Sequence, residues 1–378
     1  MSMMFLFLSA IWVAWIILGA CFQHQSHQRL TRIPHRILVS GGRGKTTLVR
    51  LVHAALTASD CPTVGRVTGD KPLLIGPDGR EHAVRRLGPA NIRELRKMLT
   101  FASKARALVV ENMAIQPELQ ATVARKLVCP NLVLMAPDVQ DHLELFPADQ
   151  KKRMETILEA HDPDIPLILP RDHSEKNYAL CADALGFSWH TYSGPAINSL
   201  RPFMRTLVEM ALTAVERTCG QVSANAKTAI LRLAGELQGI RVFRRDTTVW
   251  IDGFSVNDPL SAEQFIHTAS GEALKRGYTR EARLFNHRSD RPSRLPLFEK
   301  LLPSSGPVWV IGEPIPLHWK ARFKMKRIKG SPREIVASVE SQLPNTSQPH
   351  LVYCLGNTAG AGHALRDWLG LHAEVETW

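Results

Sequence analysis

The sequence predicts an α/β protein of two parallel-sheet domains, preceded by one apolar helix that spans a membrane. Three observations carry this prediction. Short apolar runs alternate with amphipathic stretches from about residue 36 onward, which is typical of parallel strands covered by helices. A glycine-rich turn follows the first apolar run. The first 22 residues contain no Asp, Glu, Lys, Arg or His.

Length and composition support a globular protein of more than one domain. The chain has 378 residues, and at about 150 residues per domain this length favours two or three domains. Apolar residues make up 44% and charged residues 22%, so disorder, collagen and coiled coil are excluded as the main class. A mean hydropathy of -0.11 excludes a membrane protein with many spans.

Charge and cysteine usage restrict the partners and the compartment. The chain carries 47 Lys and Arg against 35 Asp and Glu, a net charge of +12. This excess indicates an anionic partner: nucleic acid, anionic lipid, nucleotide or an acidic polymer. The six cysteines are scattered without a C-x-x-C pair, which indicates reduced thiols in the cytosol.

The N-terminal segment predicts a retained membrane anchor at residues 1–22. A helix of this length spans about 30 Å, the thickness of a bilayer core. Arg29, Arg32 and Arg36 follow the segment and no basic residue precedes it, so the N-terminus is expected outside and the rest in the cytoplasm. A cleaved signal peptide or a lipoprotein site at Leu18–Cys21 is the alternative, but the basic residues that either requires are missing.

Residues 23–35 are expected to form a basic juxtamembrane linker, residues 36–245 the first α/β domain and residues 246–378 a smaller second one. The expected strands are Arg36–Ser40, Thr63–Val67, Ala107–Val110, Asn131–Ala136, Leu167–Leu169, Thr248–Ile251, Ala282–Phe285, Val308–Ile311 and Leu351–Leu355. The expected helices are Thr46–Thr57, Ile92–Ser103, Ala148–Ala160, Met204–Arg217, Ala262–Lys275 and Gly360–Leu369.

The turn after the first strand has the composition of a phosphate-binding loop. It reads Gly41, Gly42, Arg43, Gly44, Lys45, Thr46, Thr47. Glycines let backbone N–H groups converge on one anion, and the dipole of the following helix adds positive charge. Lys45 is predicted to reach nucleotide phosphates and Thr46 to ligate Mg²⁺. Val39 stands where the full motif has its first glycine, so an ordinary strand–helix turn is the alternative.

Strand ends beside this loop supply candidate metal ligands. Glu111 ends the expected strand Ala107–Val110, and Asp141 and His142 follow the strand Asn131–Ala136. Carboxyl ends of parallel strands meet at one sheet edge, where a nucleotide and its Mg²⁺ require a carboxylate. Helix capping by Glu111 and a structural role for His142 are the alternatives.

Taken together, these residues resemble the ATP-binding core of Mur-type amide ligases. The resemblance is strongest to the CapB/PgsB-type ATPase subunit of poly-γ-glutamate synthase, which has an N-terminal membrane segment. Further segments of that pattern recur in order: Thr68–Asp70, Gly88–Ile92, Glu111–Ala114, Asp252–Asp258, Asn286–Arg291, Ile311–Glu313 and Leu355–Asn357. This implies a P-loop-containing, Mur-ligase-like central domain and a Rossmann-like C-terminal α/β domain.

The resemblance also implies roles for single residues. Lys45, Glu111, His142 and Arg288 would be catalytic, and Thr46, Glu111 and His142 would hold Mg²⁺. The loop Gly41–Thr47 with Asp252 and Asn257 would bind ATP. Weaker candidates for substrate contacts are Thr68, Asn91, Asn286, Asp290 and Arg291.

The activity implied is ATP-dependent amide formation between acids and amino acids, with an acyl phosphate as intermediate. The partners would be glutamate or a γ-glutamyl polymer, held by basic residues at 80–106 and 320–333, and other membrane subunits of a synthase or export complex. A homo-oligomer at the cell membrane is expected. The alternative is a membrane-tethered P-loop ATPase that acts on nucleic acid or as a transport motor; segments 252–257 and 286–291 favour the ligase, and nucleic acid is not the expected partner.

Overall fold

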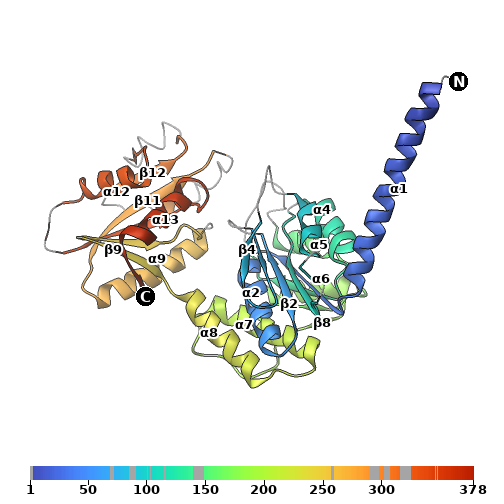
Figure 1. Cartoon of the computed structure of the whole chain (residues 1–378). Helices are drawn as coiled ribbons and strands as arrows, with labels where there is room; N and C mark the ends of the chain where they lie inside the picture. The colour runs from blue at the N-terminus through green and yellow to red at the C-terminus, as the bar shows by residue number, and fades with distance from the viewer. Residues whose placement is uncertain are drawn as a thin grey trace. The chain divides into compact units, whose positions relative to one another are not determined.

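The computed structural model divides into two compact units, Met1–Gln238 and Gly239–Trp378 (Figure 1). It describes residues 3–68, 72–84, 91–99, 101–102, 104–114, 116–138, 149–256, 259–289, 298–301, 307–315, 325–344, 346 and 348–378. The division comes before the boundary expected after Arg245. Strand β9, Arg241–Arg245, pairs with strands of the second unit and therefore belongs to it.

In the described part of the first unit, eight strands form one sheet in the order β4-β3-β2-β5-β1-β6-β7-β8. The strands are β1 His35–Gly41, β2 Thr63–Val67, β3 Leu73–Ile75, β4 Glu81–Ala83, β5 Ala107–Glu111, β6 Leu132–Ala136, β7 Leu167–Ile168 and β8 Trp189–His190. Strands β2, β5, β1, β6, β7 and β8 are parallel, whereas β3 and β4 pair antiparallel at one edge. Strand β1 lies between β5 and β6, so the ends of all three meet beside the glycine-rich turn.

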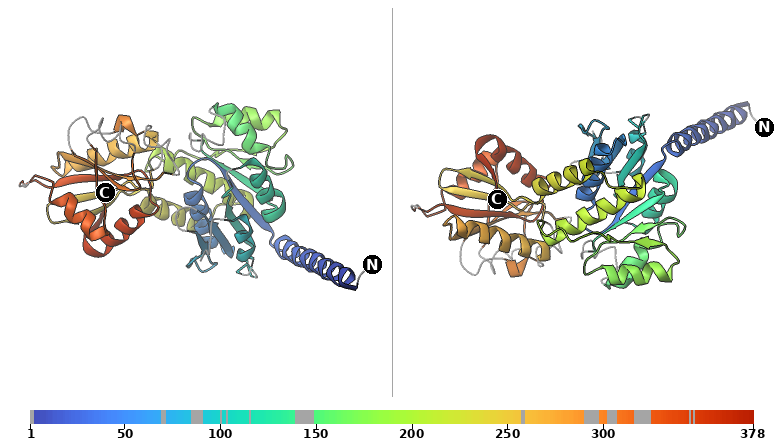
Figure 2. Two further views of the ribbon diagram at one scale, coloured as in Figure 1. Left: turned by 90° about the horizontal axis from the view of Figure 1, so that it is seen from above. Right: turned by 90° about the horizontal axis from the view of Figure 1, so that it is seen from below.

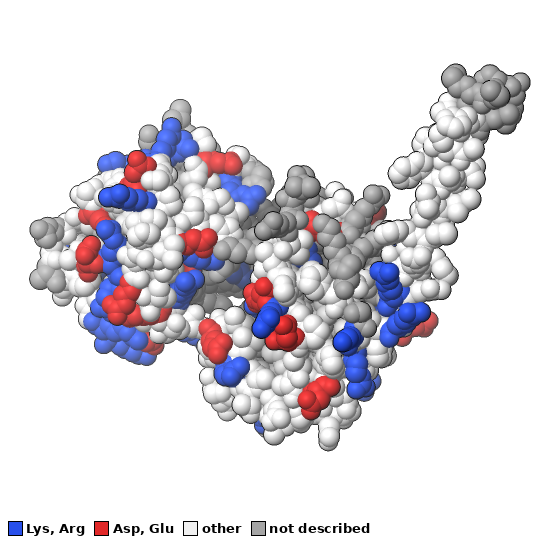
Figure 3. Space-filling model, in the orientation of Figure 1, with Lys and Arg blue, Asp and Glu red and all other residues white. Residues whose placement is uncertain are grey.

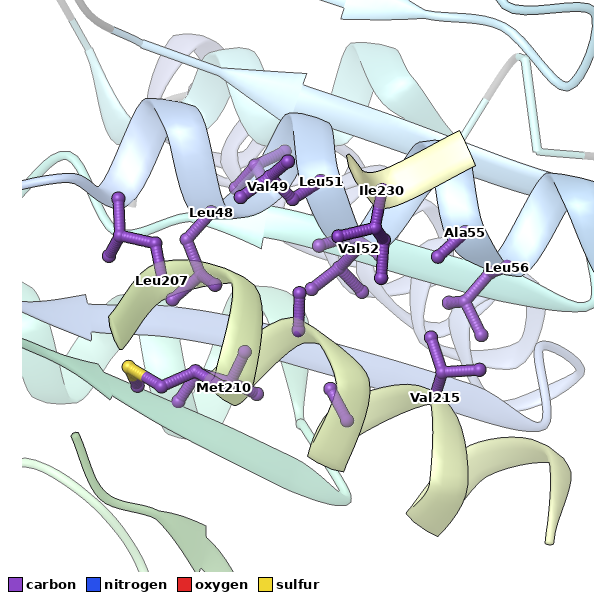
Figure 4. Packing of buried hydrophobic residues seen from close by; sticks show 14 of the residues in the cluster. Leu48, Val49, Leu51, Val52, Ala55, Leu56, Leu207, Met210, Val215 and Ile230 are labelled. Atoms are coloured by element: carbon purple, nitrogen blue, oxygen red, sulfur yellow. The ribbon is translucent and has the colours of Figure 1, made fainter. Parts of the chain in front are cut away.

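Helices cover both faces of this sheet. They are α2 Lys45–Ala58, η1 Ile92–Glu94, α3 Leu95–Met98, α4 Pro117–Thr122, the π-helix η2 Val123–Val128, α5 Gln150–Leu158, α6 Glu175–Ala184, α7 Pro202–Cys219 and α8 Ala224–Gln238. Alternate β1 residues enter different cores: Ile37 and Val39 pack with α2, α7 and α8, whereas Leu38 packs with α3, η2, α5 and α6. Figure 4 shows α2 held between α7 and α8 by Leu48, Val52 and Ile230.

The N-terminal helix α1, Met3–Thr31, extends away from the rest of its unit in both views of Figure 2. Among the described residues it is the one helix long and apolar enough to cross a membrane, and its apolar window is not buried. The helix does not end with the apolar segment. It continues through most of residues 23–35, which were expected to form a linker, and its last turn packs on the unit through the buried Leu30.

In the described part of the second unit, seven strands form a sheet in the order β13-β12-β11-β14-β10-β9-β15. Besides β9 they are β10 Thr248–Asp252, β11 Arg280–His287, β12 Val308–Gly312, β13 Lys326–Arg327, β14 His350–Leu355 and β15 Glu374–Thr377. Helix α9, Pro259–Lys275, packs on one face, and α12, Pro332–Glu340, with α13, Ala361–His372, on the other. A short helix, η3, spans Glu299–Leu301.

All nine strands expected from the apolar runs are present. The helix expected over Ile92–Ser103 is shorter, because helical structure ends at Met98. The short or antiparallel strands β3, β4, β8, β9, β13 and β15 were not expected.

Candidate functional site

The glycine-rich turn connects the end of β1 to the start of α2. Gly41 and Gly44 have φ angles of +93° and +90°, a backbone region that favours glycine. A Cβ on Gly41 would lie 2.5 Å from the carbonyl oxygen of Ala136, so the turn lies directly against the end of β6. The backbone N–H groups of Gly42 and Arg43 donate to the carbonyls of Ala136 and Pro137, at 3.4 and 3.0 Å.

The side chain of Lys45 bends back over this turn. Its Nζ donates to the carbonyl oxygens of Gly41 and Gly42, at 3.0 and 2.6 Å. The ammonium group therefore lies above the turn, where an anion held by the turn would meet it. The N-terminus of α2 points its dipole at the same place, which favours negative charge there.

The carboxylate of Glu111 connects three elements at this sheet edge. Glu111 ends β5, in register with Val39 of β1, and is 5% exposed. Its Oε2 accepts hydrogen bonds from the Thr46 hydroxyl at 3.0 Å and from the Thr68 backbone N–H at 2.7 Å. The structure thus brings together three residues that the sequence analysis singled out: two candidate metal ligands and one candidate substrate residue.

The chain just after β6 contributes to an ion pair that was not predicted from the sequence. Asp138 and Arg153 are both buried, and the guanidinium binds the carboxylate through two contacts, Nε to Oδ1 at 2.9 Å and Nη2 to Oδ2 at 2.5 Å. The hydrogen bond to Asp138 raises the pKa of Arg153. The buried Tyr178 hydroxyl donates to the Ala136 carbonyl at 3.3 Å, and burial raises its pKa.

The available sequence signal for this pair was the position of Asp138 after the end of β6, comparable to that of Glu111 at the end of β5. The partner Arg153 lies on α5, at a sequence distance that no local pattern predicts.

In the second unit, two predicted residues lie at the carboxyl ends of β10 and β11, which β14 separates in the sheet. Asp252 ends β10 and forms an ion pair with Arg366 of α13, with Nε to Oδ2 at 2.8 Å. Asn286 lies in β11 and is 2% exposed; its Nδ2 donates to the carbonyls of Asn357 and Ala359, at 2.5 and 2.9 Å. Asn286 therefore connects β11 to the turn after β14. Its contact with a substrate stays a prediction.

Two further predicted residues lie in loops. Arg288 follows β11 and is half-buried. Burial lowers the pKa of His287, the residue before it. Asn91 is exposed, and its backbone N–H donates to Glu94 at 3.3 Å. His142, Asn257, Asp290 and Arg291 lie outside the described residues, as do residues 320–324 of the second basic cluster. Within the described ranges no group of three or more His, Cys, Asp or Glu gathers as a metal cluster.

Comparison with known proteins connects this geometry to a family. Residues 237–371 match the family model of the poly-gamma-glutamate synthase CapB C-terminal domain. Two curated relatives are similar over 166 residues: capsule biosynthesis protein CapB of Bacillus anthracis, 29% identical, and PGA synthase CapB of Bacillus subtilis, 28% identical. The first match covers 43% of this chain and 35% of the relative, and the second covers 40% of this chain and 41% of the relative. The matches therefore span less than half the length of either relative.

Solved structures show the fold along most of the chain. The bifunctional folylpolyglutamate synthase/dihydrofolate synthase of Yersinia pestis, crystallised with AMPPNP and a Mn ion, has a TM-score of 0.62 at 12% identity and covers 93% of this chain and 92% of its own. Escherichia coli FolC in complex with ADP has a TM-score of 0.62 at 14% identity and covers 92% of each chain. The predicted α/β fold is confirmed and matches that of the folylpolyglutamate synthases. The resemblance to the CapB type of poly-γ-glutamate synthase is likewise confirmed, the family-model match lying over residues 237–371.

Proposed function

We propose that this chain is a membrane-anchored, ATP-dependent amide ligase of the poly-γ-glutamate synthase type, which forms γ-glutamyl amide bonds. One observation carries the proposal: beside the glycine-rich turn of Lys45, the Glu111 carboxylate accepts hydrogen bonds from the Thr46 hydroxyl and from the Thr68 backbone N–H. This arrangement is the one that a nucleotide with its metal ion requires. The family match in the second unit supports the ligase over other nucleotide-dependent activities.

The residues at the turn fit a bound nucleotide and Mg²⁺. The Thr46 hydroxyl and the Glu111 carboxylate lie 3.0 Å apart, and both are oxygen ligands of the kind that Mg²⁺ prefers. Lys45, the backbone N–H groups at the start of α2 and the α2 dipole supply the positive charge for the phosphates. When bound, Mg²⁺ neutralises charge that develops on the phosphates. We keep His142 as the proposed ligand of a second ion.

The side chains of this site would bind and orient, since phosphoryl transfer depends mainly on positioning and charge. Lys45 and the turn hold the γ-phosphate in line for attack by a glutamyl carboxylate. The attack gives an acyl phosphate and ADP, and an amine then displaces phosphate to form the amide. Asp252, Asn257 and Arg288 stay the proposed nucleotide and catalytic residues of the second unit, and Asn91, Asn286, Asp290 and Arg291 the proposed substrate contacts.

We further propose that α1 crosses the cell membrane once and leaves both units in the cytoplasm. The relatives' names refer to capsule and poly-γ-glutamate synthesis, which supports glutamate or its γ-linked polymer as substrate. The excess of 47 basic over 35 acidic residues suits a polyanion. Other membrane subunits and further copies of this chain are the proposed protein partners.

The test is the dependence of ATP cleavage on the acceptor. The full chain, both purified in detergent and in its membrane fraction, is incubated with ATP, Mg²⁺ and each amino acid in turn. We expect ADP release that rises with glutamate or short γ-glutamyl chains, and new amide bonds by mass spectrometry. Arg288→Ala should lower coupled turnover much more than ATP binding. Stimulation by DNA or RNA, no amide product with any amino acid and no effect of Arg288→Ala would instead identify a nucleic-acid ATPase.

A further inference from the structure

A pocket lies where helix α1 meets the first unit. Its volume is about 450 Å³, within the range of about 300–1,000 Å³ that is usual for ligand sites. One wall is a single face of α1, formed by Ala20, Gln23, His24, Ser26, His27 and Leu30. The other wall consists of Leu99, which follows α3, and of Arg125, Lys126 and Leu127 from the π-helix η2.

The lining combines an apolar floor with hydrogen-bond donors. Leu30 and Leu99 are 2% and 8% exposed and belong to the same buried cluster. Six lining side chains carry donors, namely Gln23, His24, Ser26, His27, Arg125 and Lys126, and no lining residue carries a carboxylate. The chemistry of the lining therefore favours an anion attached to an apolar body.

The donors on η2 differ in how they are fixed. Arg125 Nη2 donates to the carbonyls of Glu159 and His161, at 2.9 and 3.0 Å, so its guanidinium is held in place by the segment after α5. Lys126 is exposed at the pocket. Arg125 thus has a structural role besides its charge, whereas the exposed Lys126 contributes charge to the pocket.

The pocket begins where the apolar surface of α1 ends. Trp12, Trp15 and Phe22 are 70%, 70% and 68% exposed. On the face that Figure 3 shows, this helix carries no charged atoms above its base, where Lys and Arg atoms gather. Arg29 lies in its last turn. If α1 spans the membrane as proposed above, on which this inference rests, residues 23–30 lie at the level of the lipid headgroups.

We propose that this pocket binds an anionic phospholipid of the leaflet that faces the two units. The phosphate is bound by Arg125 and Lys126 of η2 and by His24 and His27 of α1. The acyl chains lie along the exposed apolar surface of α1 toward Phe22. Leu30 and Leu99 form the floor beneath the glycerol. Because the anion site adjoins the proposed membrane segment, a lipid reaches both parts at once, whereas a soluble phosphate uses only the polar part.

The experiment measures lipid selectivity directly. The full chain in non-ionic detergent receives equal amounts of phosphatidylglycerol and phosphatidylcholine of matched chains, and native mass spectrometry counts the lipids retained. A basic side chain near an anionic leaflet contributes about fivefold in affinity. We expect the parent chain to retain more phosphatidylglycerol than phosphatidylcholine. Lys126→Ala should retain at least about fivefold less phosphatidylglycerol, and the double variant Lys126→Glu, His27→Glu should retain still less. Lys126→Arg should keep the preference.

Lys227→Ala is the matched control, because Lys227 is exposed on α8 of the same unit but does not line the pocket. Equal retention of the two lipids would overturn the proposal. An equal loss of phosphatidylglycerol in Lys227→Ala would also overturn it. So would glycerol 1-phosphate that displaces phosphatidylglycerol as strongly as the lipid itself does. Carbonate extraction of membranes separates the failures: a chain that washes off lacks the proposed anchor, whereas an anchored chain without lipid preference lacks only this site.

Discussion

Replacement of Gly41 by alanine tests whether the glycine-rich turn builds the nucleotide site. The new Cβ would lie 2.5 Å from the Ala136 oxygen and 2.8 Å from its nitrogen, where ordinary contact begins at 3.4 Å. The φ of +93° is also unfavourable for alanine. Both neighbouring atoms belong to the backbone of β6, a strand inside the sheet, so the turn must move rather than the strand.

The cost can be estimated from the contacts. A left-handed backbone costs a residue with a Cβ about 1–2 kcal/mol. Moving the turn away from β6 lengthens the hydrogen bonds of Gly42 and Arg43 to the Ala136 and Pro137 carbonyls, at about 0.5–1.5 kcal/mol each. The sum is about 2–5 kcal/mol against the observed turn. Even about 2 kcal/mol leaves only a few per cent of molecules with that turn, which weakens ATP binding about thirtyfold.

The assay is equilibrium binding of ATP with Mg²⁺ by calorimetry, together with urea unfolding of the same protein. Gly186→Ala is the control: Gly186 follows α6, has a φ of +79° and has nothing within 4 Å of an added Cβ. It should lower the free energy of unfolding by about 1–2 kcal/mol and leave ATP affinity unchanged. If Gly41→Ala binds ATP as well as the parent, or if Gly186→Ala loses as much affinity, the turn does not form the nucleotide site.

Three further variants test single groups. Lys45→Ala should abolish ATP turnover but keep the circular dichroism spectrum and the unfolding midpoint; turnover in the folded variant would refute its role. Glu111→Gln should require at least about tenfold more Mg²⁺, because the charge is lost while the shape is kept, and a Mg²⁺ titration that overlays the parent would make Glu111 a purely structural residue. Burial lowers the pKa of His161 from 6.5 to about 4. Between these two pH values the imidazole is protonated in the unfolded chain and neutral in the folded chain. The free energy of unfolding is therefore unaffected by this group above pH 6.5 and falls by about 1.4 kcal/mol per pH unit from pH 6.5 toward pH 4. His161→Leu should flatten this pH dependence in urea unfolding.

The fold was predictable where burial decides the structure. Val39, Val109 and Leu134 lie in continuous apolar runs because their strands are buried on both faces. Edge strands were not predictable from such runs. All three residues of β4 are exposed, and so are three of the four residues of β15 at the edge of the second sheet.

The core of the candidate site was predictable from the order of the parallel strands. Lys45, Thr46 and Glu111 follow strands whose neighbours the parallel order sets, so their meeting depends on the sheet alone. The Asp138–Arg153 pair depends on how α5 returns over the sheet, and a sequence pattern carries no such information. The buried contacts of Asn286 were likewise invisible, because the carbonyls that it binds follow β14, about 70 residues later.

The hydrogen bonds at the turn also imply that its residues act as a unit. Oε2 of Glu111 serves both the Thr46 hydroxyl and the Thr68 N–H. Any ion that takes this oxygen as a ligand therefore competes with or shares those bonds, and a change at one residue alters the other two. The Ala136 carbonyl is shared in the same way, between the Gly42 N–H and the Tyr178 hydroxyl. Energies of substitutions in this group should not add, which distinguishes a site built across three strand ends from a set of independent contacts.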